Sequence, residues 1–281
     1  MQPIKAENSG RVYYVRPPIF RRWHSWMTTV ATYSDEVETK RLALVKIVPQ
    51  SLCEMVIDLH ERTVPKEFVI TRKLTNQCFA KIATDWGVCQ SYLETPHSVV
   101  FLFYTLQTKE VSLTSLIADT GCLTETDLKI YLVQIYHALE CLWENYGLLV
   151  RGFLPVKIMV HPGEKVPRIQ DYDDIAENST MNENTLIGKG KSSFTFVPPE
   201  FQEVETVPCG QLLVFQFGQT LYFMATGTFY YGVPEWPLSV SDSMRRFIMS
   251  CLLPERVKFF EVKNSPLFRE AEKTFKEFAG V

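Results

Sequence analysis

Glycine is missing from a long stretch of this chain. Between Gly10 and Gly87 the sequence contains none. Only glycine lets successive backbone amides approach phosphate oxygens closely, so this stretch lacks the residues from which a glycine-rich phosphate loop is built. The segment from Pro17 to His24 contains two prolines, which have no amide hydrogen, and several bulky side chains. A phosphate-binding hairpin is therefore not expected in this part of the chain.

Metal-binding spacings are missing as well. The five histidines are isolated, and none belongs to a His-x-x-His or Glu-x-x-His unit, so we interpret His137 as a structural residue of a helix. An odd number of scattered cysteines predicts reduced, mostly buried thiols and neither a disulfide framework nor a zinc site. The seven cysteines are Cys53, Cys78, Cys89, Cys122, Cys141, Cys209 and Cys251.

The sequence has neither a strong charge of one sign nor a long apolar run. Its 281 residues carry a formal net charge of −3 with a pI near 6.0, and the basic residues are dispersed, which argues against nucleic-acid binding. No apolar run reaches membrane length and residues 1–10 are polar, so we expect no membrane insertion and no signal peptide. We expect a cytoplasmic protein. The 46% hydrophobic content is ample for two cores.

A long amphipathic helix is predicted in the middle of the chain. Thr124 followed by Asp127 forms a capping-box start, and Gly147 ends the helical pattern. Between them, apolar residues recur at helical spacing. These residues are Leu128, Leu132, Ile135, Leu139 and Leu142.

Strands dominate the pattern before this helix, and helices dominate it afterwards. One or two strands are expected within residues 1–40, and the segment Glu177 to Ser193 is polar enough to be a loop. The other expected elements are a strand at Leu42–Ile47, a helix around Thr63–Leu74, and strands at Phe79–Tyr92 and Ser98–Leu106.

The segment from Leu149 to Asp173 resembles the catalytic loop of protein kinases. The kinase pattern reads His-Arg-Asp, then Leu-Lys-Pro-Glu-Asn, then two strands and Asp-Phe-Gly. In this chain Val150-Arg151-Gly152 aligns with His-Arg-Asp, and Asp171-Tyr172-Asp173 aligns with Asp-Phe-Gly. Arg151 and Pro155 match the pattern.

Three positions that carry the chemistry differ from this pattern. The resemblance puts Gly152 at the catalytic aspartate, Leu154 at the lysine that steadies the γ-phosphate, and Lys157 at the asparagine that ligates a second magnesium ion. Glycine has no carboxylate to deprotonate a substrate hydroxyl, and an ammonium group repels the metal ion. The loop therefore predicts a protein with little or no phosphoryl transfer.

Further motifs before and after this loop also resemble kinase motifs. Lys46 lies in an apolar strand like the Val-Ala-Ile-Lys strand, and Glu67 follows like the helix glutamate that pairs with that lysine. Val197–Glu200 resembles Ala-Pro-Glu. In the closing signature Leu-Pro-Glu-Arg, Arg256 corresponds to the arginine that pairs with the Ala-Pro-Glu glutamate, so we expect it to contact Glu200.

A buried helix of the kinase pattern, Asp-x-Trp-x-x-Gly, is matched only in part. Leu213 stands at the aspartate and Phe215 at the tryptophan, while Gly218 is retained. Three other patterns look most similar to the AGC group of serine/threonine kinases: Glu67-x-x-Ile70-x-x-x-Leu74, Gln134-Ile135-x-x-Ala138-Leu139-Glu140, and the Leu-Pro-Glu-Arg to Asn-Ser-Pro-Leu-Phe tail. The C-terminal hydrophobic tail motif of that group has no recognisable counterpart.

The resemblance implies an α+β fold with two lobes in a single domain, 1–281. Residues 1–106 would form a small antiparallel sheet lobe with one main helix, residues 107–110 the hinge, and residues 111–281 a larger, mainly helical lobe. Phe103 would lie at the back wall of the nucleotide pocket, and Arg151, Glu200, Gly218 and Arg256 would be structural.

Lys46, Glu67 and Asp171 would then be the remnant of a nucleotide-binding site. Two interpretations are open: residual ATP binding, or an ion pair that holds the lobes together. The missing glycine hairpin favours the ion pair, and Lys157 could itself neutralise Asp171. We therefore expect no cofactor and no bound metal.

The expected function is that of a pseudokinase, a scaffold or allosteric regulator that binds a protein partner such as an active kinase or another signalling enzyme. The aromatic-rich segment Phe229–Pro237 is the candidate partner surface, although its aromatic residues could equally belong to the core. The alternative is an unconventional active kinase or other nucleotide-using enzyme, in which Asp171, Asp173 or Asp174 supplies a displaced metal site.

Overall fold

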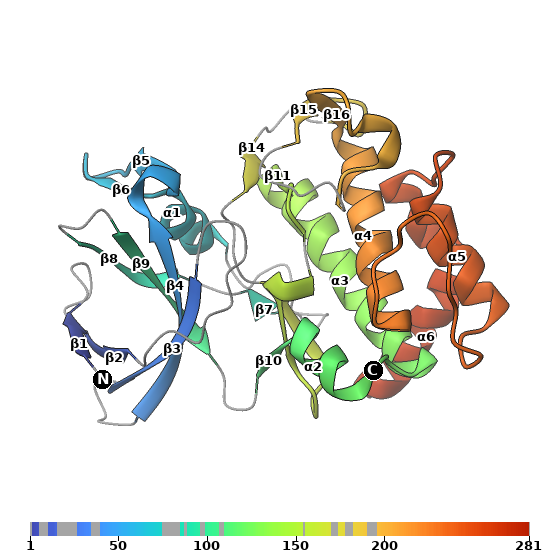
Figure 1. Cartoon of the computed structure of the whole chain (residues 1–281), viewed down its shortest axis with the longest axis horizontal. Helices are drawn as coiled ribbons and strands as arrows, with labels where there is room; N and C mark the ends of the chain where they lie inside the picture. Colours follow the sequence, from blue (N-terminus) through green and yellow to red (C-terminus); the bar gives the residue numbers. More distant parts are fainter. Residues whose placement is uncertain are drawn as a thin grey trace. The chain divides into compact units, whose positions relative to one another are not determined.

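The computed structural model divides the chain into two compact units. The first unit contains Met1–Asn76, Trp86–Glu110 and Gln170–Asp173, and the second contains Gln77–Asp85, Val111–Ile169 and Asp174–Val281. Figure 1 follows the elements along the sequence. The structure describes residues 2–5, 11–15, 27–34, 40–74, 85–86, 89–95, 99–106, 110–153, 155–169, 174–177, 182–189 and 196–280.

The first unit is built on an antiparallel sheet. Its strand order is β1-β2-β3-β4-β9-β8, and each neighbouring pair is antiparallel. The central strand β4 is rich in branched aliphatic residues, which suit a pleated surface buried on both faces. The strands are β1 (Gln2–Lys5), β2 (Val12–Val15), β3 (Met27–Ser34), β4 (Lys40–Pro49), β8 (Cys89–Glu94) and β9 (Val99–Leu106).

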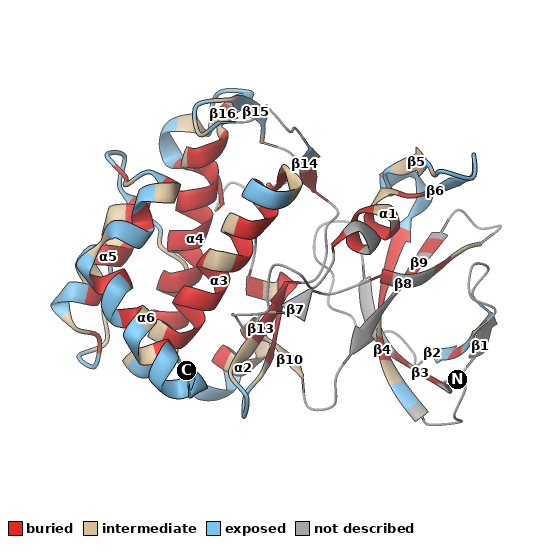
Figure 2. Cartoon of the chain, turned by 180° about the vertical axis from the view of Figure 1, so that it is seen from behind, coloured by how far each residue is buried: buried red, intermediate tan, exposed pale blue. Residues whose placement is uncertain are grey.

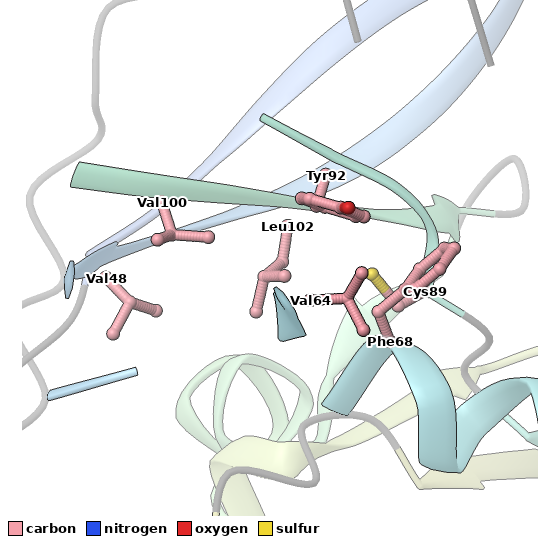
Figure 3. Packing of buried hydrophobic residues seen from close by; sticks show 7 residues of the cluster. All are labelled: Val48, Val64, Phe68, Cys89, Tyr92, Val100 and Leu102. Carbon is pink, nitrogen blue, oxygen red and sulfur yellow. The ribbon is translucent and has the colours of Figure 1, made fainter. Parts of the chain in front are cut away.

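Both faces of this sheet are covered by apolar side chains. Alternate residues of a strand point to opposite faces, so Ala43, Val45 and Ile47 pack with Tyr13 and Tyr33 on one side. On the other side the sheet packs against helix α1 (Lys66–Lys73) and the hairpin of β5 (Met55–Ile57) and β6 (Thr63–Pro65). Figure 3 shows this second cluster, which consists of Val48, Val64, Phe68, Cys89, Tyr92, Val100 and Leu102.

The second unit is organised around two long helices. Figure 2 shows that α3 (Glu125–Tyr146) and α4 (Cys209–Thr226) are largely buried. Helix α3 packs against α4 and α6, and α4 packs against α5. Rings of Tyr136, Phe217, Phe259 and Phe268 contact one another between these helices. The remaining α-helices described are α2 (Leu113–Thr120), α5 (Asp242–Leu252) and α6 (Pro266–Ala279).

Short strands and 3-10 turns connect these helices. A sheet of order β10-β12-β13-β7 contains β10 (Val111–Ser112), β12 (Ile158–His161), β13 (Val166–Ile169) and β7 (Asp85–Trp86). Two-stranded pairs join β11 (Leu148–Val150) to β14 (Ile175–Glu177) and β15 (Leu186–Gly188) to β16 (Thr206–Pro208). Among the residues described, the 3-10 helices of this unit are η3 (Pro155–Lys157), η5 (Pro199–Phe201) and η6 (Phe259–Asn264), whereas η1 (Gln50–Leu52) belongs to the first unit.

The predicted central helix is confirmed at both ends. The side chain of Thr124 accepts a hydrogen bond from the amide of Asp127 at 3.2 Å, and Gly147 ends the helix in the left-handed conformation with φ of 59°. The mixture of helices and small antiparallel sheets also confirms the coarse prediction of a mixed α and β fold.

Three local predictions were wrong in detail. The helix expected around Thr63–Leu74 begins only at Lys66, because residues 63–65 form β6 and pair with β5. The expected loop Glu177 to Ser193 contains β15, because residues 186–188 pair with β16. Within the expected strand Phe79–Tyr92, β7 and β8 belong to different sheets. In each case partner strands decide the conformation, which local composition does not reveal.

The prediction of reduced thiols fails at one position. Cys141 of α3 is disulfide-bonded, and its partner lies outside the described residues. The other cysteines in the described part of the chain are not in disulfides, namely Cys53, Cys89, Cys122, Cys209 and Cys251. A spacing pattern cannot reveal cysteines that only the tertiary fold brings together. In the residues described, no helix is both long enough and apolar enough to cross a bilayer.

Candidate functional site

Lys46 and Glu67 form a buried ion pair in the first unit. Lys46 lies in β4 on the same face as Leu44 and Val48, and Glu67 lies in the first turn of α1, which covers that face. The Nζ atom of Lys46 is 2.9 Å from Oε2 of Glu67, and the two residues are 1% and 5% exposed. The pair therefore joins the central strand to the helix of the same unit.

The space beside this pair is small. A cavity lined by Lys46, Glu67, Val48 and residues of the connection between β4 and α1 has a volume of about 20 Å³. A single water molecule needs about 10–15 Å³ of such volume. Lys46 is thus enclosed with a carboxylate partner already in place, which supports the structural interpretation of the pair.

The kinase-like loop of the second unit begins where β11 ends. Val150 pairs with Ile175 of β14, and the amide of Arg151 extends the pairing by donating to the carbonyl oxygen of Asp174 at 2.9 Å. The guanidinium of Arg151 also lies 2.8 Å from the carboxylate of Asp174, which is 3% exposed. The retained arginine thus holds the one acid of the 171–174 segment that the structure describes.

Gly152 packs directly against Lys157. A Cβ atom at Gly152 would lie 3.3 Å from Nζ of Lys157 and 3.8 Å from Oδ2 of Asp174. Lys157 is in η3 and is only 5% exposed. Where the resemblance puts a catalytic carboxylate, the nearest polar group is therefore a buried ammonium.

Gln216 fixes the backbone on both sides of Gly152. This fully buried residue of α4 accepts a hydrogen bond from the amide of Phe153 through Oε1 at 3.1 Å. Its Nε2 donates to the carbonyl oxygens of Arg151 and Phe196. Sequence analysis missed this residue, although a glutamine in a buried apolar helix needs hydrogen-bond partners and is a readable signal.

The predicted contact between Arg256 and Glu200 is confirmed. The Nη1 atom of Arg256 donates to Oε1 of Glu200 and, at 2.6 Å, to Oε1 of Gln211. Nη2 donates to the carbonyl oxygen of Leu252 at 3.3 Å, and the guanidinium lies over the ring of Phe215. The arginine therefore ties η5 and both helices α4 and α5 together.

Gly218 lies at the closest approach of α4 and α5. A Cβ atom at this position would be 2.8 Å from Cβ of Cys251 and 3.0 Å from a side-chain carbon of Leu252. The Cβ atom of Cys251 is bonded directly to the backbone of α5 and cannot move aside easily. The two helices can therefore pack at this distance only with glycine at position 218. Leu213 and Phe215 are buried at the positions that correspond to the aspartate and tryptophan of the kinase helix.

Several predicted site residues are not described. Leu154, Asp171 and Asp173 lie outside the described residues, as does the segment Pro17 to His24. Phe103 belongs to β9, but its side chain is not described. Of residues 107–110, only Glu110 is described.

The segment Phe229–Pro237 divides into a packed part and an exposed part. Phe229 stacks on Phe223, and Trp236 packs on Tyr222. By contrast, Tyr231 and Val233 are 75% and 77% exposed, and the next residue after the segment, Leu238, is 100% exposed.

This loop is held by a second glutamine of α4. Gln219 donates from Nε2 to the carbonyl oxygen of Tyr230 and accepts from the amide of Tyr230, both at 3.0 Å. The exposed apolar side chains are thus presented from a fixed backbone.

The chemistry that this arrangement permits is limited. Around Gly152 the described residues provide two cationic groups, from Arg151 and Lys157, and the carboxylate of Asp174, which is bound to Arg151. A general base needs an available acceptor within reach of the substrate proton. No group of three or more His, Cys, Asp or Glu side chains that could hold a metal ion exists within the described ranges.

Comparison of the chain with protein-family models gives no match, and comparison with curated proteins gives none either.

Proposed function

We propose that this protein has a kinase-like fold of two lobes without phosphoryl-transfer activity, and that it acts by binding a protein partner. The observation that carries the proposal is the surroundings of Gly152. A position that needs a carboxylate in an active kinase has no side chain, and the buried ammonium of Lys157 occupies the adjoining space.

The content of the two units supports the kinase-like fold. The first unit has an antiparallel sheet with one main helix, and the second is mainly helical. The ion pairs Lys46–Glu67 and Arg256–Glu200 join the residues that the kinase pattern pairs.

We favour a function in binding because the backbone around Gly152 is held by buried hydrogen bonds, while position 152 carries no carboxylate. Gln216 satisfies three backbone groups around the loop that carries Gly152. These hydrogen bonds fix the backbone conformation. A surface that is already fixed loses less conformational entropy when it binds a partner. The exposed side chains of Tyr231, Val233 and Leu238 offer apolar contact area for a protein such as an active kinase or another signalling enzyme.

Radiolabelled ATP tests the absence of catalysis. The purified protein is incubated with labelled ATP, a general protein substrate and either magnesium or manganese, beside an Asp171→Ala variant. Asp242→Ala, on the exposed first turn of α5, is the matched control for the substitution. We expect no incorporation in any sample. Incorporation that Asp171→Ala abolishes and Asp242→Ala preserves would overturn the proposal.

A thermal-shift titration tests whether a nucleotide binds at all. A ligand that binds only the folded state raises the melting temperature by mass action. We expect no ATP-dependent rise with or without magnesium, because Lys46 is already enclosed with Glu67. A magnesium-dependent rise would show that the pair belongs to a working nucleotide site, while the result with labelled ATP would still decide the question of catalysis.

A further inference from the structure

A cavity of about 220 Å³ lies within the second unit. Its wall is formed by the C-terminal end of α2, the connection from α2 to α3, the first turns of α3, and the turn between β12 and β13. Its lining residues include none of the kinase-like positions Lys46, Glu67 and Gly152.

Tyr131 contributes an unusual group to this wall. It is 2% exposed, and its hydroxyl has no hydrogen-bond partner among the described residues. Its oxygen is not among the fully buried side-chain atoms that lack a partner, so it keeps contact with the space of the cavity. Tyr131 follows Asp127 by one helical turn, and both side chains line the cavity, so the hydroxyl is on the cavity side of α3.

The hydroxyl of Tyr131 is available as a donor. Burial, and then the nearby charge of Asp127, raise the pKa of this phenol well above its usual range. The group therefore keeps its proton at any physiological pH. A hydrogen-bond acceptor on a bound molecule would supply the partner that the protein does not.

The other polar groups of the wall are largely engaged. The carboxylate of Asp127 pairs with Nζ of Lys165, which also lies over the ring of Phe278 at 5.4 Å. The Oγ1 atom of Thr124 caps α3. One positive and one negative charge cancel in the wall, so neither a cation nor an anion is favoured. Leu116, Leu123 and Pro162 supply apolar surface.

The turn that closes the cavity is fixed in place. Lys165 has φ of 52°, a left-handed conformation that is uncommon for a residue other than glycine. Its amide donates to the carbonyl oxygen of His161 at 2.8 Å, and its own carbonyl oxygen accepts from Nε2 of the buried Gln134 at 2.8 Å. Because the backbone is held on both sides, the cavity is formed before any ligand arrives.

We propose that this cavity binds a small uncharged organic molecule, whose apolar body contacts Leu116, Leu123 and Pro162 and whose oxygen accepts a hydrogen bond from Tyr131. Pockets for drug-sized ligands have volumes of about 300–1,000 Å³, so the ligand of this cavity is smaller than such molecules. The proposal does not depend on the kinase-like fold or on the absence of catalysis.

Two probes of the same shape test the proposal. Acetophenone carries a carbonyl oxygen, and α-methylstyrene carries a CH₂ group in its place. Ligand-observed NMR titrations give Kd for each probe with the wild-type protein and with Tyr131→Phe. A net hydrogen bond contributes about 0.5–1.5 kcal/mol, so the wild type should bind acetophenone about 2- to 10-fold more tightly than α-methylstyrene. Tyr131→Phe should lose this preference and keep the affinity for α-methylstyrene.

Protection of Cys122 from alkylation shows whether the probe binds in this cavity. Cys122 is a partly buried cysteine of the cavity wall, and Cys53 is a partly buried cysteine of the first unit; neither is in a disulfide. Saturating acetophenone should slow alkylation of Cys122 by iodoacetamide and leave the rate at Cys53 unchanged, in the wild-type protein. This readout does not require any variant to fold.

Three results would overturn the proposal. The first is the absence of saturable binding of either probe to the wild type, which would leave the cavity to water alone. The second is equal affinity of the wild type for both probes, or an undiminished preference in Tyr131→Phe with a wild-type melting curve. The third is protection of Cys122 and Cys53 to the same extent.

Discussion

Two buried lysines of this protein have different surroundings. Lys46 lies in a strand and meets a carboxylate at 2.9 Å, as the kinase pattern of the first unit demands. Lys157 lies in a 3-10 turn beside Gly152, where that pattern has an asparagine next to an aspartate. The resemblance therefore rests on a pair of side chains in the first unit, whereas around Gly152 in the second unit the side chains differ from the pattern.

This difference shows that framework and chemistry are separable. The course of the 151–153 loop depends on Gln216 and on the pairing of Arg151 with Asp174, and neither contact needs a side chain at Gly152. The course of this loop therefore does not depend on a carboxylate at position 152. A buried ion pair such as Lys46–Glu67 cannot lose one partner so easily, because the charge of the other residue would remain buried.

Breaking the Lys46–Glu67 pair should have the largest effect. Glu67→Ala takes the carboxylate away from the buried ammonium of Lys46, and we expect the free energy of unfolding to fall by about 3–5 kcal/mol. The double variant Lys46→Met/Glu67→Leu removes both charges and should be close to the wild type. Urea denaturation of the three proteins measures this. If the double variant is as unstable as Glu67→Ala, the pair is more than a structural element.

Removing the amide of Gln216 should have the next largest effect. In Gln216→Met the amide of Phe153 and the carbonyl oxygen of Phe196 lose a buried partner, each at a cost of about 1–3 kcal/mol, so we expect a loss of about 3 kcal/mol.

Gln219→Met is the matched control for this change, because Gln219 lies on the same helix and bonds to the backbone of Tyr230. It should cost less, since Tyr230 belongs to a partly exposed loop where water can replace the lost bonds. An equal loss in both variants, measured by urea denaturation, would contradict a special role of Gln216 at the kinase-like loop.

Gly218→Ala should destabilise the protein by about 1–3 kcal/mol through overpacking. The added methyl group would meet Cβ of Cys251 at 2.8 Å. Gly188→Ala is a suitable control, since no atom lies within 4 Å of a Cβ at that position. Differential scanning calorimetry compares the two. A wild-type melting temperature for Gly218→Ala would mean that α4 and α5 can separate slightly without loss.

The smallest effect concerns a more exposed ion pair and its response to pH. Burial tends to raise the pKa of Glu140, but hydrogen bonds from His137 and Lys263 outweigh burial and place the pKa below its ordinary value of 4.5. A carboxyl whose pKa is lower when folded stabilises the protein above the unfolded pKa, and this contribution is lost as the pH falls through the folded pKa.

Glu140→Gln isolates this contribution. The stability difference between wild type and variant should be largest near neutral pH and should shrink below about pH 4, by the linkage of proton binding to folding. Urea denaturation at several pH values measures it. A difference that grows on acidification would mean that folding raises the pKa of Glu140 instead of lowering it.

The sequence predicted the parts of the molecule whose signals are local. The cap at Thr124 and the stop at Gly147 define α3 because a capping side chain and a left-handed glycine act within a few residues. The contact of Arg256 with Glu200 was predicted through the kinase resemblance, and it is present. The spacing of residues along the sequence alone would not have paired Arg256 with Glu200.

The sequence did not predict features that depend on which segments meet. Thr63 and Val64 extend a hairpin only because β5 lies beside them. The bonds of Gln216 to Arg151 and Phe153 require α4 to pass beside the 151–153 loop, and the disulfide at Cys141 requires a second cysteine that the fold brings close. Polar residues in buried helices are the one signal that could have directed attention to Gln216 and Gln219 beforehand.

The two glutamines of α4 have a mechanical consequence. They lie three residues apart, and each grips a different loop, one carrying Gly152 and the other carrying Tyr231. A rigid helix transmits displacement along its whole length, so a shift of α4 by a fraction of a turn would pull on both loops simultaneously. A displacement of the loop that carries Tyr231 would in this way also displace the loop that carries Gly152.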